Sequence, residues 1–254
     1  MTKFSANLGF LWNDRSLPDA IICAKAAGFD AVECHWPYAT PIAAVKQALN
    51  VTDLAMLGLN TSRGDTSVGE NGLSALPDRI DDARTAIDQA LDYAVQIGTP
   101  NIHVMAGFAI GVDAHETFVR NLAYACEKAS KNGQSILIEP LNKYDASGYF
   151  LQTTDQAKAI IEEVGASNLK LMFDCYHVQL MEGDLTHKIE SLMPLIGHLQ
   201  FASVPERASP DRGEVNYSHI FAHLEKLGYD APLGAEYKPQ GTTDESLGWL
   251  ATLR

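Results

Sequence analysis

The sequence has no long apolar run, no paired-cysteine motif and no excess of basic residues, and each absence excludes a class of protein. No run approaches the roughly 20 apolar residues that a membrane-spanning helix needs. The N-terminus lacks the apolar core and cleavage site of a signal peptide. The cysteines are scattered and form no C-x-x-C pair, which is typical of reduced intracellular thiols. We therefore expect a cytoplasmic protein.

The charge balance excludes further partners. The chain has 254 residues and a formal net charge of −13. Nucleic acids and anionic membranes require clustered Lys and Arg, so the sequence predicts neither partner. An apolar fraction of 46% is sufficient for a sizeable core. Length alone leaves one large domain or two small ones open.

Short strand-like runs alternate along the chain with longer amphipathic runs. The segments 77–98 and 113–132 place apolar residues on one face at helical spacing. Eight such strand–helix units match the roughly 250 residues of a (β/α)₈ barrel. The rival is an open doubly wound sheet, but no G-x-G-x-x-G loop occurs. We predict an α/β fold, a single-domain TIM barrel over residues 1–254. The expected strands are Phe4–Phe10, Ala31–His35, Asp53–Asn60, Asn101–Ala106, Ser135–Glu139, Leu169–Asp174, Gly197–Ala202 and Leu233–Glu236.

Polar residues occupy the ends of the last four expected strands. These residues are Glu139, Asp174, Gln200 and Glu236. A buried carboxylate costs several kcal/mol unless it is paired or coordinated. The active site of a barrel lies at the carboxyl ends of its strands, and adjacent strands are about 4.8 Å apart. An all-oxygen set favours Mg²⁺ or Mn²⁺, so we predict a divalent metal site.

Each of these residues also has an ordinary structural explanation when it is taken alone. Glu139 would be a loop-facing salt-bridge partner, Asp174 a helix cap, Gln200 a buried amide and Glu236 an exposed residue. Their common depth in four consecutive strands favours a shared site instead.

Several residues near these strand ends carry weaker signals. His177 follows Asp174 by three residues, and Arg207 follows the seventh strand, where it could neutralise an anionic substrate or pair with Glu206 or Asp211. Trp12 and Trp36 follow the first two strands and could line the site or serve only packing. The irregular stretch Thr61–Leu76 has no assigned role, although loops of this length are usually functional or mobile.

At these residues the chain resembles the hydroxypyruvate isomerase family of the xylose-isomerase-like barrel superfamily. The likeness is specific in its combination and covers the C-terminal half, with weaker likeness before it, as in Phe29-x-x-Val32-Glu33. The matching stretches are Ile138-Glu139-Pro140-Leu141-Asn142, Phe173-Asp174-Cys175-Tyr176-His177-Val178-Gln179, Met181-Glu182-Gly183-Asp184, Ile196-Gly197-His198-Leu199-Gln200, Pro205-x-Arg207, Gly213-Glu214-Val215-Asn216-Tyr217 and Glu236-Tyr237-Lys238-Pro239-Gln240.

The resemblance implies a specific reaction and roles for these residues. It implies interconversion of hydroxypyruvate and tartronate semialdehyde, with a metal held by Glu139, Asp174, Gln200 and Glu236. Glu139 and Glu236 would also be the acid/base pair, and His177 and Arg207 would contact the substrate. The segment 202–204 (Ala-Ser-Val) departs from the Ala-Asp-Asn of some relatives. The substrate is therefore open, with a 2-oxo-tetronate isomerase or a ketose epimerase as alternatives.

Two other functions and the oligomeric state are also open. A metal-dependent hydrolase of the apurinic-site endonuclease type would need a His-rich zinc site and a basic DNA-binding face, which the acidic balance disfavours. A non-catalytic barrel that binds a sugar acid would not need acid/base residues. Nothing in the sequence decides whether the protein forms a homo-oligomer.

Overall fold

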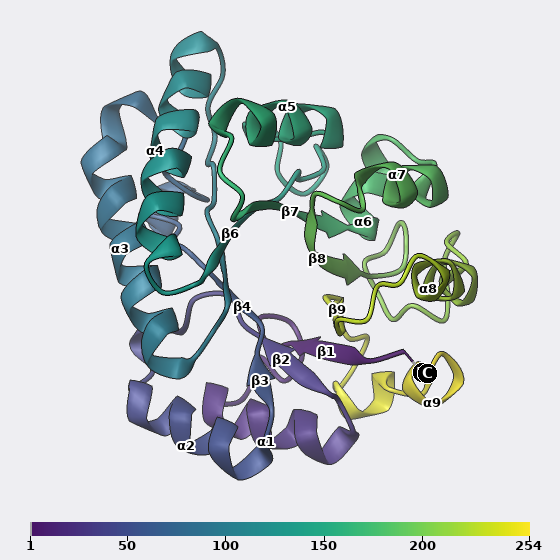
Figure 1. Cartoon of the computed structure of the whole chain (residues 1–254). Coiled ribbons are helices and arrows are strands. Elements are labelled where there is room, and N and C mark those ends of the chain that lie inside the picture. The colour runs from purple at the N-terminus through teal and green to yellow at the C-terminus, as the bar shows by residue number, and fades with distance from the viewer. Residues whose placement is uncertain (1) are drawn as a thin grey trace. The chain divides into compact units, whose positions relative to one another are not determined.

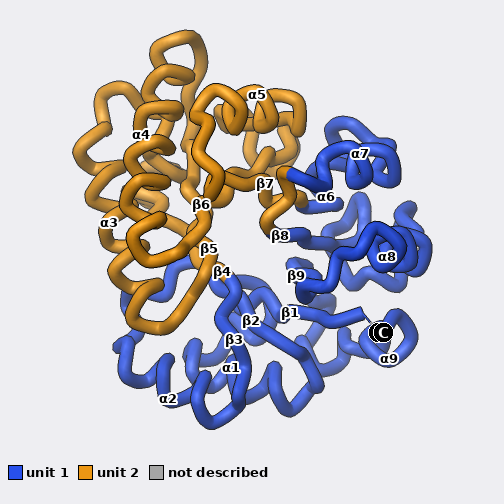
Figure 2. The backbone as a smooth tube through the Cα atoms, viewed as in Figure 1, with its two compact units in different colours: residues 1–57, 174–194, 198–254 blue, residues 58–173, 195–197 orange. Residues whose placement is uncertain are grey.

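The computed structural model describes residues 2–254 and divides into two compact units, which Figure 2 shows in different colours. Unit 1 comprises residues 1–57, 174–194 and 198–254, and unit 2 comprises residues 58–173 and 195–197. Each unit contains parallel strands that are connected through helices (Figure 1). The prediction of a single domain stays a prediction.

In unit 1, a parallel sheet has the strand order β3-β2-β1-β9-β8. Ala6 of β1 lies opposite Val32 of β2 on one side and opposite Ala235 of β9 on the other. The elements are β1 (Phe4–Asn7), α1 (Leu17–Ala27), β2 (Ala31–Glu33), α2 (Ile42–Thr52), β3 (Ala55–Met56), α6 (Cys175–Met181), α7 (Leu185–Leu192), most of β8 (Ile196–Phe201), α8 (Tyr217–Lys226), β9 (Leu233–Ala235) and α9 (Trp249–Thr252).

An aromatic cluster forms the centre of the unit 1 core. The Phe4 ring lies 5.1 Å from the Trp249 ring and 5.4 Å from the Phe221 ring. Phe201 of β8 packs against the same rings. These side chains are at most 3% exposed, so two strands and two helices are fixed by one apolar contact region.

In unit 2, the strand order is β4-β5-β6-β7, again parallel. Leu59, Ile102 and Ile136 lie opposite one another across β4, β5 and β6. The elements are β4 (Gly58–Asn60), α3 (Ile80–Ile97), β5 (Asn101–His103), α4 (Val112–Ser130), β6 (Ser135–Ile138), α5 (Thr154–Val164) and β7 (Leu169–Asp174), with the final residue of β7 belonging to unit 1.

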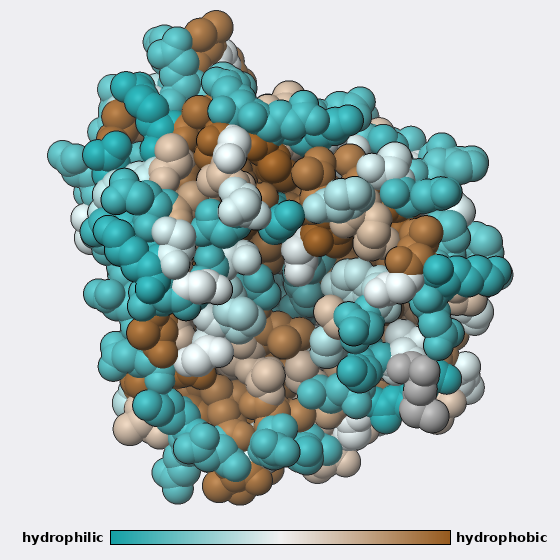
Figure 3. Space-filling model, viewed as in Figure 1, coloured by the Kyte–Doolittle hydropathy of each residue, from teal (hydrophilic) through white to brown (hydrophobic). Residues whose placement is uncertain are grey.

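The helices of unit 2 follow the predicted amphipathic pattern. In α3, Ala83, Ile87 and Leu91 are buried, as helical spacing requires. Helices α3 and α4 pack against each other (Figure 1), and their outer faces are mainly hydrophilic in Figure 3. None of the helices in residues 2–254 combines the length and apolar character that a bilayer crossing needs.

Threonine side chains cap the turns at 153–156 and 242–245, and the second cap is a reciprocal capping box. At α5, the Thr153 hydroxyl accepts the Gln156 N–H at 3.2 Å. At the second site, the Thr242 hydroxyl accepts the Glu245 N–H and the Glu245 carboxylate accepts the Thr242 N–H. The second box precedes only a short 3₁₀ turn, Asp244–Ser246, because the chain turns again before a helix can propagate.

The strand expected at 53–60 is interrupted and forms two strands. Asp53 adopts a left-handed conformation (φ 52°) at the end of α2, so the strand starts later than expected. Strand β3 pairs with β2, whereas β4 pairs with β5. Leu57 lies between them and donates its N–H to the Val32 carbonyl at 2.7 Å. The apolar pattern was correct, but the break depends on pairing partners that are distant in sequence.

The stretch 61–76 is anchored at its end by close backbone contacts. Ser74 and Ala75 donate their N–H groups to the Met105 and Ala106 carbonyls at 3.2 and 2.8 Å. Gly72 has φ +113°, and a Cβ there would lie 2.7 Å from both the Gly107 nitrogen and the Met105 oxygen. Only glycine fits this approach without displacing backbone.

Replacing Gly72 with alanine should therefore destabilise the protein by about 3 kcal/mol, through a strained φ and a backbone clash. Gly69→Ala is the matched control in the same loop, because Gly69 also has a positive φ of +85° but nothing lies within 4 Å of its missing Cβ. The control should cost about 1 kcal/mol. Urea unfolding of both variants measures the difference. Equal losses would contradict the close approach.

Candidate active site

Polar side chains of unit 1 gather at the carboxyl ends of its parallel strands. Asn7 ends β1, Glu33 ends β2, Gln200 lies next to the end of β8, and Glu236 follows β9. Parallel strands present their carboxyl ends along one edge of a sheet. These side chains are buried, at 2%, 3%, 3% and 6% exposed respectively. A buried group of this kind requires polar partners within the protein.

Both oxygens of the Glu236 carboxylate have partners. Oε2 accepts a bond from Arg207 Nη2 at 2.6 Å, and Oε1 lies 3.0 Å from Asn7 Nδ2 and 2.9 Å from His35 Nε2. Burial alone would raise the pKa of Glu236, but the Arg207 charge and the His35 contact outweigh it and hold that pKa well below its usual range. Glu236 is therefore ionised at neutral pH.

Asp174 is both a helix cap and a member of this cluster. Its Oδ1 accepts the Tyr176 N–H at 2.9 Å at the start of α6. Its Oδ2 accepts no hydrogen bond within residues 2–254, and Arg207 Nη2 and His177 Nε2 each lie 3.6 Å from it. Burial raises the pKa of Asp174 to about 7, against the opposing charge of Arg207. The predicted cap and the predicted site residue are thus the same side chain.

Arg207 contacts both carboxylates and packs against two aromatic rings. Its guanidinium lies 4.8 Å from the centre of the Phe10 ring and 4.9 Å from that of Tyr176. Its backbone has φ +54°, an unfavourable conformation for arginine. Arg207 is only 9% exposed. The alternative of a surface arginine paired with Glu206 or Asp211 is wrong, because the charge is directed into the cluster.

Glu33 connects to Gln200 through a second buried network. The Glu33 carboxylate forms short contacts with His198 Nε2 and accepts a bond from Gln200 Nε2 at 3.2 Å. Burial would lower the pKa of His198, but the charge and hydrogen bond of Glu33, together with the charges of Glu236 and Asp174, outweigh burial and raise that pKa. Gln200 is therefore more than a buried amide, because it hydrogen-bonds a strand-end carboxylate.

Glu139 belongs to unit 2, where it is the first residue after β6. It is 6% exposed, and its Oε2 lies 3.6 Å from Nδ1 of His103 on β5. The alternative of a loop-facing residue is therefore wrong. His103 is itself buried, at 3% exposed. Strand β6 pairs in parallel with β7, the strand that ends at Asp174.

Sequence reasoning missed several residues of this region. Asn7 and Glu33 end the observed strands β1 and β2, but the expected strands Phe4–Phe10 and Ala31–His35 extended past both residues and placed neither at a strand end. His198 precedes Gln200 by two residues, which places both on one face of β8. His35 is the last residue of the expected strand Ala31–His35, so it carried the strand-end signal and was overlooked. Trp12 is a packing residue, 2% exposed, with its indole N–H bonded to Asp244.

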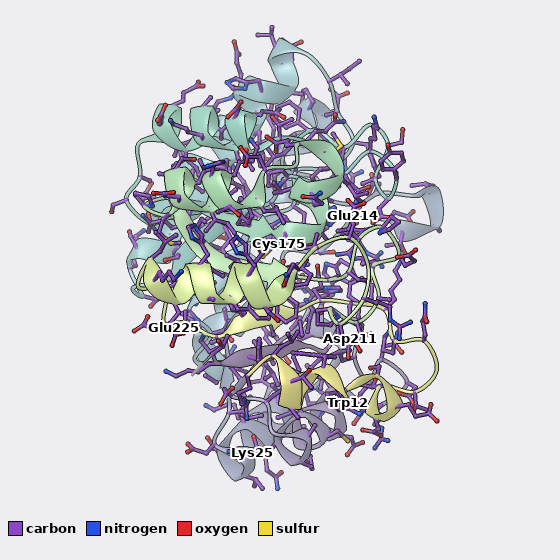
Figure 4. All side chains as sticks on the ribbon, turned by 90° about the vertical axis from the view of Figure 1, so that its right-hand side faces the viewer. Trp12, Lys25, Cys175, Asp211, Glu214 and Glu225 are labelled. Carbon is purple, nitrogen blue, oxygen red and sulfur yellow. The ribbon has the colours of Figure 1, made fainter. Side chains whose placement is uncertain are left out.

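The unit 1 residues fit a hard divalent cation. Asp174 Oδ2 and Gln200 Oε1 are buried oxygens that accept no hydrogen bond within residues 2–254. Glu236 supplies a further buried carboxylate. Burial raises the pKa of the Cys175 thiol well above its usual value, which disfavours that sulfur as a metal ligand. Figure 4 labels Cys175, which follows Asp174 in the chain. Oxygen donors of this kind suit Mg²⁺ or Mn²⁺.

Comparison with known proteins gives full-length matches. A family model described as "Xylose isomerase-like TIM barrel" matches residues 22–253. The chain is 45% identical to a 2-oxo-tetronate isomerase of Cupriavidus necator over 98% of both chains. It is 37% identical to a hydroxypyruvate isomerase of Escherichia coli over the whole of both. A crystal structure of a protein named AP endonuclease, family 2, from Brucella melitensis has 36% identity and a TM-score of 0.96, with complete coverage of both chains.

Because the pKa of Asp174 is raised, we expect the substitution Asp174→Asn to stabilise the folded protein, by an amount that depends on pH. The unfolded chain releases this proton near pH 3.8, whereas the folded protein holds it to about pH 7. The group therefore costs stability progressively as the pH rises from about 4 to 7. Asparagine keeps the Oδ1 cap but cannot ionise. In EDTA, the free energy of unfolding of the variant relative to wild type should increase by about 2–4 kcal/mol as the pH rises from 4 to 8.

Denaturant unfolding across that pH range measures the effect. Asp65→Asn is the control, since the Asp65 side chain also accepts a backbone N–H, from Ser67, but lies at the surface. Hydrogen bonds to Ser67 lower the pKa of Asp65, so its contribution is lost only in acid. The stability of the Asp65→Asn control relative to wild type should not change between pH 5 and 8. A gain for Asp174→Asn that does not vary with pH would contradict the assignment.

Proposed function

Because the chain belongs to the xylose isomerase-like TIM barrel family, we propose that it interconverts hydroxypyruvate and tartronate semialdehyde through an enediolate. The predicted (β/α)₈ fold is confirmed by that membership. The chain is an isomerase of the aldose–ketose type, as are the relatives that match along its length. The substrate, the mechanism, the cytoplasmic location and the roles of individual residues are proposals.

One observation carries the proposal: a buried, ionised Glu236 shares Arg207 with Asp174. An isomerase of this type must remove a proton next to a carbonyl and stabilise the oxyanion that develops. Glu236 supplies an ionised carboxylate, and Arg207 supplies a fixed positive charge beside it. A purely structural ion pair would not need two carboxylates, two histidines and a stacked arginine at one sheet edge.

We assign the ion to Glu139, Asp174, Gln200 and Glu236, with Mg²⁺ or Mn²⁺ as the metal. When bound, such an ion would supply Lewis-acid stabilisation of the substrate's carbonyl and hydroxyl oxygens. Glu139 supports this assignment by its burial and its place after β6, whose neighbour β7 ends at Asp174. Gln200 contributes an oxygen without adding a further negative charge.

Side chains of the protein would bind the substrate and transfer its proton. Arg207 would bind the substrate carboxylate, and His177, 3.6 Å from Asp174, would contact the substrate hydroxyl. One of the two glutamates takes the carbon proton and the same or the other returns it to the neighbouring carbon. When the substrate carboxylate pairs with Arg207, the positive charge of Arg207 is shared, and its stabilisation of the Glu236 carboxylate weakens. Its pKa then rises, so substrate binding itself makes Glu236 a stronger base.

A 2-oxo-tetronate is the second candidate substrate. The reacting α-hydroxycarbonyl is the same, and the relative at 45% identity carries that activity in its name. The two substrates differ by one carbon, so discrimination depends on contacts beyond the reacting atoms. Ketose epimerisation stays a further alternative.

Glu236→Gln and Glu139→Gln should each reduce turnover by roughly 10²–10⁴-fold, because each removes a positioned acid/base. Turnover is measured by NMR on hydroxypyruvate with Mg²⁺ or Mn²⁺ present. Glu206→Gln is the matched control, since Glu206 is exposed and adjacent to Arg207 in the chain. It should retain wild-type turnover. Near-wild-type turnover of Glu139→Gln with metal bound would remove that residue from the mechanism.

A substrate panel in D₂O tests the reaction class. Hydroxypyruvate, 2-oxo-tetronates and small ketoses are compared, and the true substrate should lose its α-proton signal by exchange through the enediolate. Chelation with EDTA should abolish exchange, and added Mg²⁺ or Mn²⁺ should restore it. Full activity in rigorously metal-free protein would exclude the ion. No exchange with any compound would favour a barrel that only binds.

A nuclease is a necessary comparison, because the similar Brucella melitensis protein is named an AP endonuclease. DNA binding depends on neutralising phosphates, and a net charge of −13 opposes it. An oxygen-rich donor set in unit 1 is also unlike a His-rich zinc site. A titration with DNA that contains an abasic site should give no binding at physiological salt.

A further inference from the structure

Glu33 is the centre of a buried hydrogen-bond network that the proposed reaction does not use. Its Oε1 accepts bonds from Gln200 Nε2 at 3.2 Å and Asn7 Nδ2 at 3.3 Å, and its Oε2 contacts His198 Nε2. Glu33 is 3% exposed. Asn7 Nδ2 also lies 3.0 Å from Glu236, so Glu33 is connected to two of the assigned ligands.

The contact with Glu33 determines which way the Gln200 amide faces. A side-chain amide has an oxygen that accepts and an NH₂ that donates, and only the NH₂ can bond to a carboxylate. Gln200 Nε2 is therefore fixed towards Glu33. The oxygen, Oε1, is turned to the other side of the amide, where it is buried and accepts no hydrogen bond within residues 2–254. The reversed amide would place two acceptor oxygens against each other.

The backbone of β9 is shaped to admit this arrangement. Gly234 lies opposite Gln200 in the sheet. A Cβ at position 234 would lie 2.5 Å from Glu33 Oε1, 2.8 Å from Gln200 Cγ and 3.0 Å from His198 Nε2. Any larger residue would displace all three side chains. The close packing of Glu33, His198 and Gln200 thus depends on a missing side chain on the neighbouring strand.

We propose that Glu33, itself held by His198, is a positioning residue that orients the Gln200 amide so that its oxygen faces the divalent cation. The inference rests on the proposed function, because it requires that the cation bind at Gln200. Without Glu33, the amide could rotate and present its NH₂ group, which is no metal ligand. A carboxylate that orients a ligand in this way typically contributes 10- to 100-fold to metal affinity.

The test measures Mn²⁺ affinity of the full-length protein by isothermal titration calorimetry, independent of turnover. Glu33→Gln keeps the shape but allows the amide of residue 33 to donate as well as accept, and it should weaken Mn²⁺ binding about 10- to 100-fold. Glu225→Gln is the matched control, an equal loss of charge at an exposed position on α8 (Figure 4). It should bind as wild type does.

A double-mutant cycle separates orientation from simple loss of charge. In the Gln200→Ala background there is no amide to orient, so adding Glu33→Gln should cost less than about 3-fold in Mn²⁺ affinity. A loss from the missing negative charge would persist undiminished in that background. An undiminished loss, or wild-type affinity of Glu33→Gln, would overturn the proposal. No Mn²⁺ binding by the wild-type protein would instead refute the proposed metal site.

Circular dichroism and thermal unfolding show whether Glu33→Gln folds. If it does not, substitutions of His198 test the same proposal. His198→Gln retains a donor towards Glu33 and should keep most of the affinity. His198→Leu removes the donor, frees Glu33 and should weaken Mn²⁺ binding at least 10-fold. Equal affinities of the two variants would also overturn the proposal.

Discussion

The buried contact between Arg207 and the Glu236 carboxylate is the interaction on which the rest of the unit 1 site depends. Asp174 and Glu236 lie in a region from which water is largely excluded, and each would be expensive to ionise there. Arg207 contacts both, at 3.6 and 2.6 Å. Burial raises the pKa of both carboxylates and the Arg207 charge lowers it. The charge, together with His35, prevails at Glu236, whose pKa falls, whereas burial prevails at Asp174, whose pKa rises to about 7. One cation therefore keeps one carboxylate charged and leaves the other poised near neutral pH.

This inequality is useful to a protein that must bind both a cation and an anion. A fully neutralised site would have little attraction for a divalent ion, and an uncompensated one would destabilise the fold. Arg207 is held in place by the Phe10 and Tyr176 rings and by a strained backbone, so its charge is fixed before any ligand arrives. Preorganised charge of this kind costs stability in the free protein and avoids reorganisation during reaction.

The strand pattern and the strand-end residues were predictable from the sequence because both depend on local alternation and on burial. Strand β7 has the predicted bounds, and Asp174, Gln200 and Glu236 are buried as the pattern required. The break at Leu57 and the direction of Arg207 were not predictable. Both depend on contacts with strands that are remote in sequence, and neither leaves a mark on the local composition. Glu33 was missed because the expected strand Ala31–His35 extended two residues past the observed end of β2 and placed Glu33 inside the strand.

The amide at position 200 is best understood through its neighbour. Glutamate would offer a stronger oxygen ligand, but it would stand about 3 Å from the Glu33 carboxylate, and two such charges repel strongly when buried. Glutamine avoids this repulsion, and its NH₂ group donates a hydrogen bond to Glu33. The cost is that an amide has one useless orientation, which the network of Glu33, His198 and Gly234 excludes. The neutral Gln200 ligand and the acidic Glu33 therefore belong together, because glutamine supplies an oxygen to the metal without placing a second buried negative charge beside Glu33.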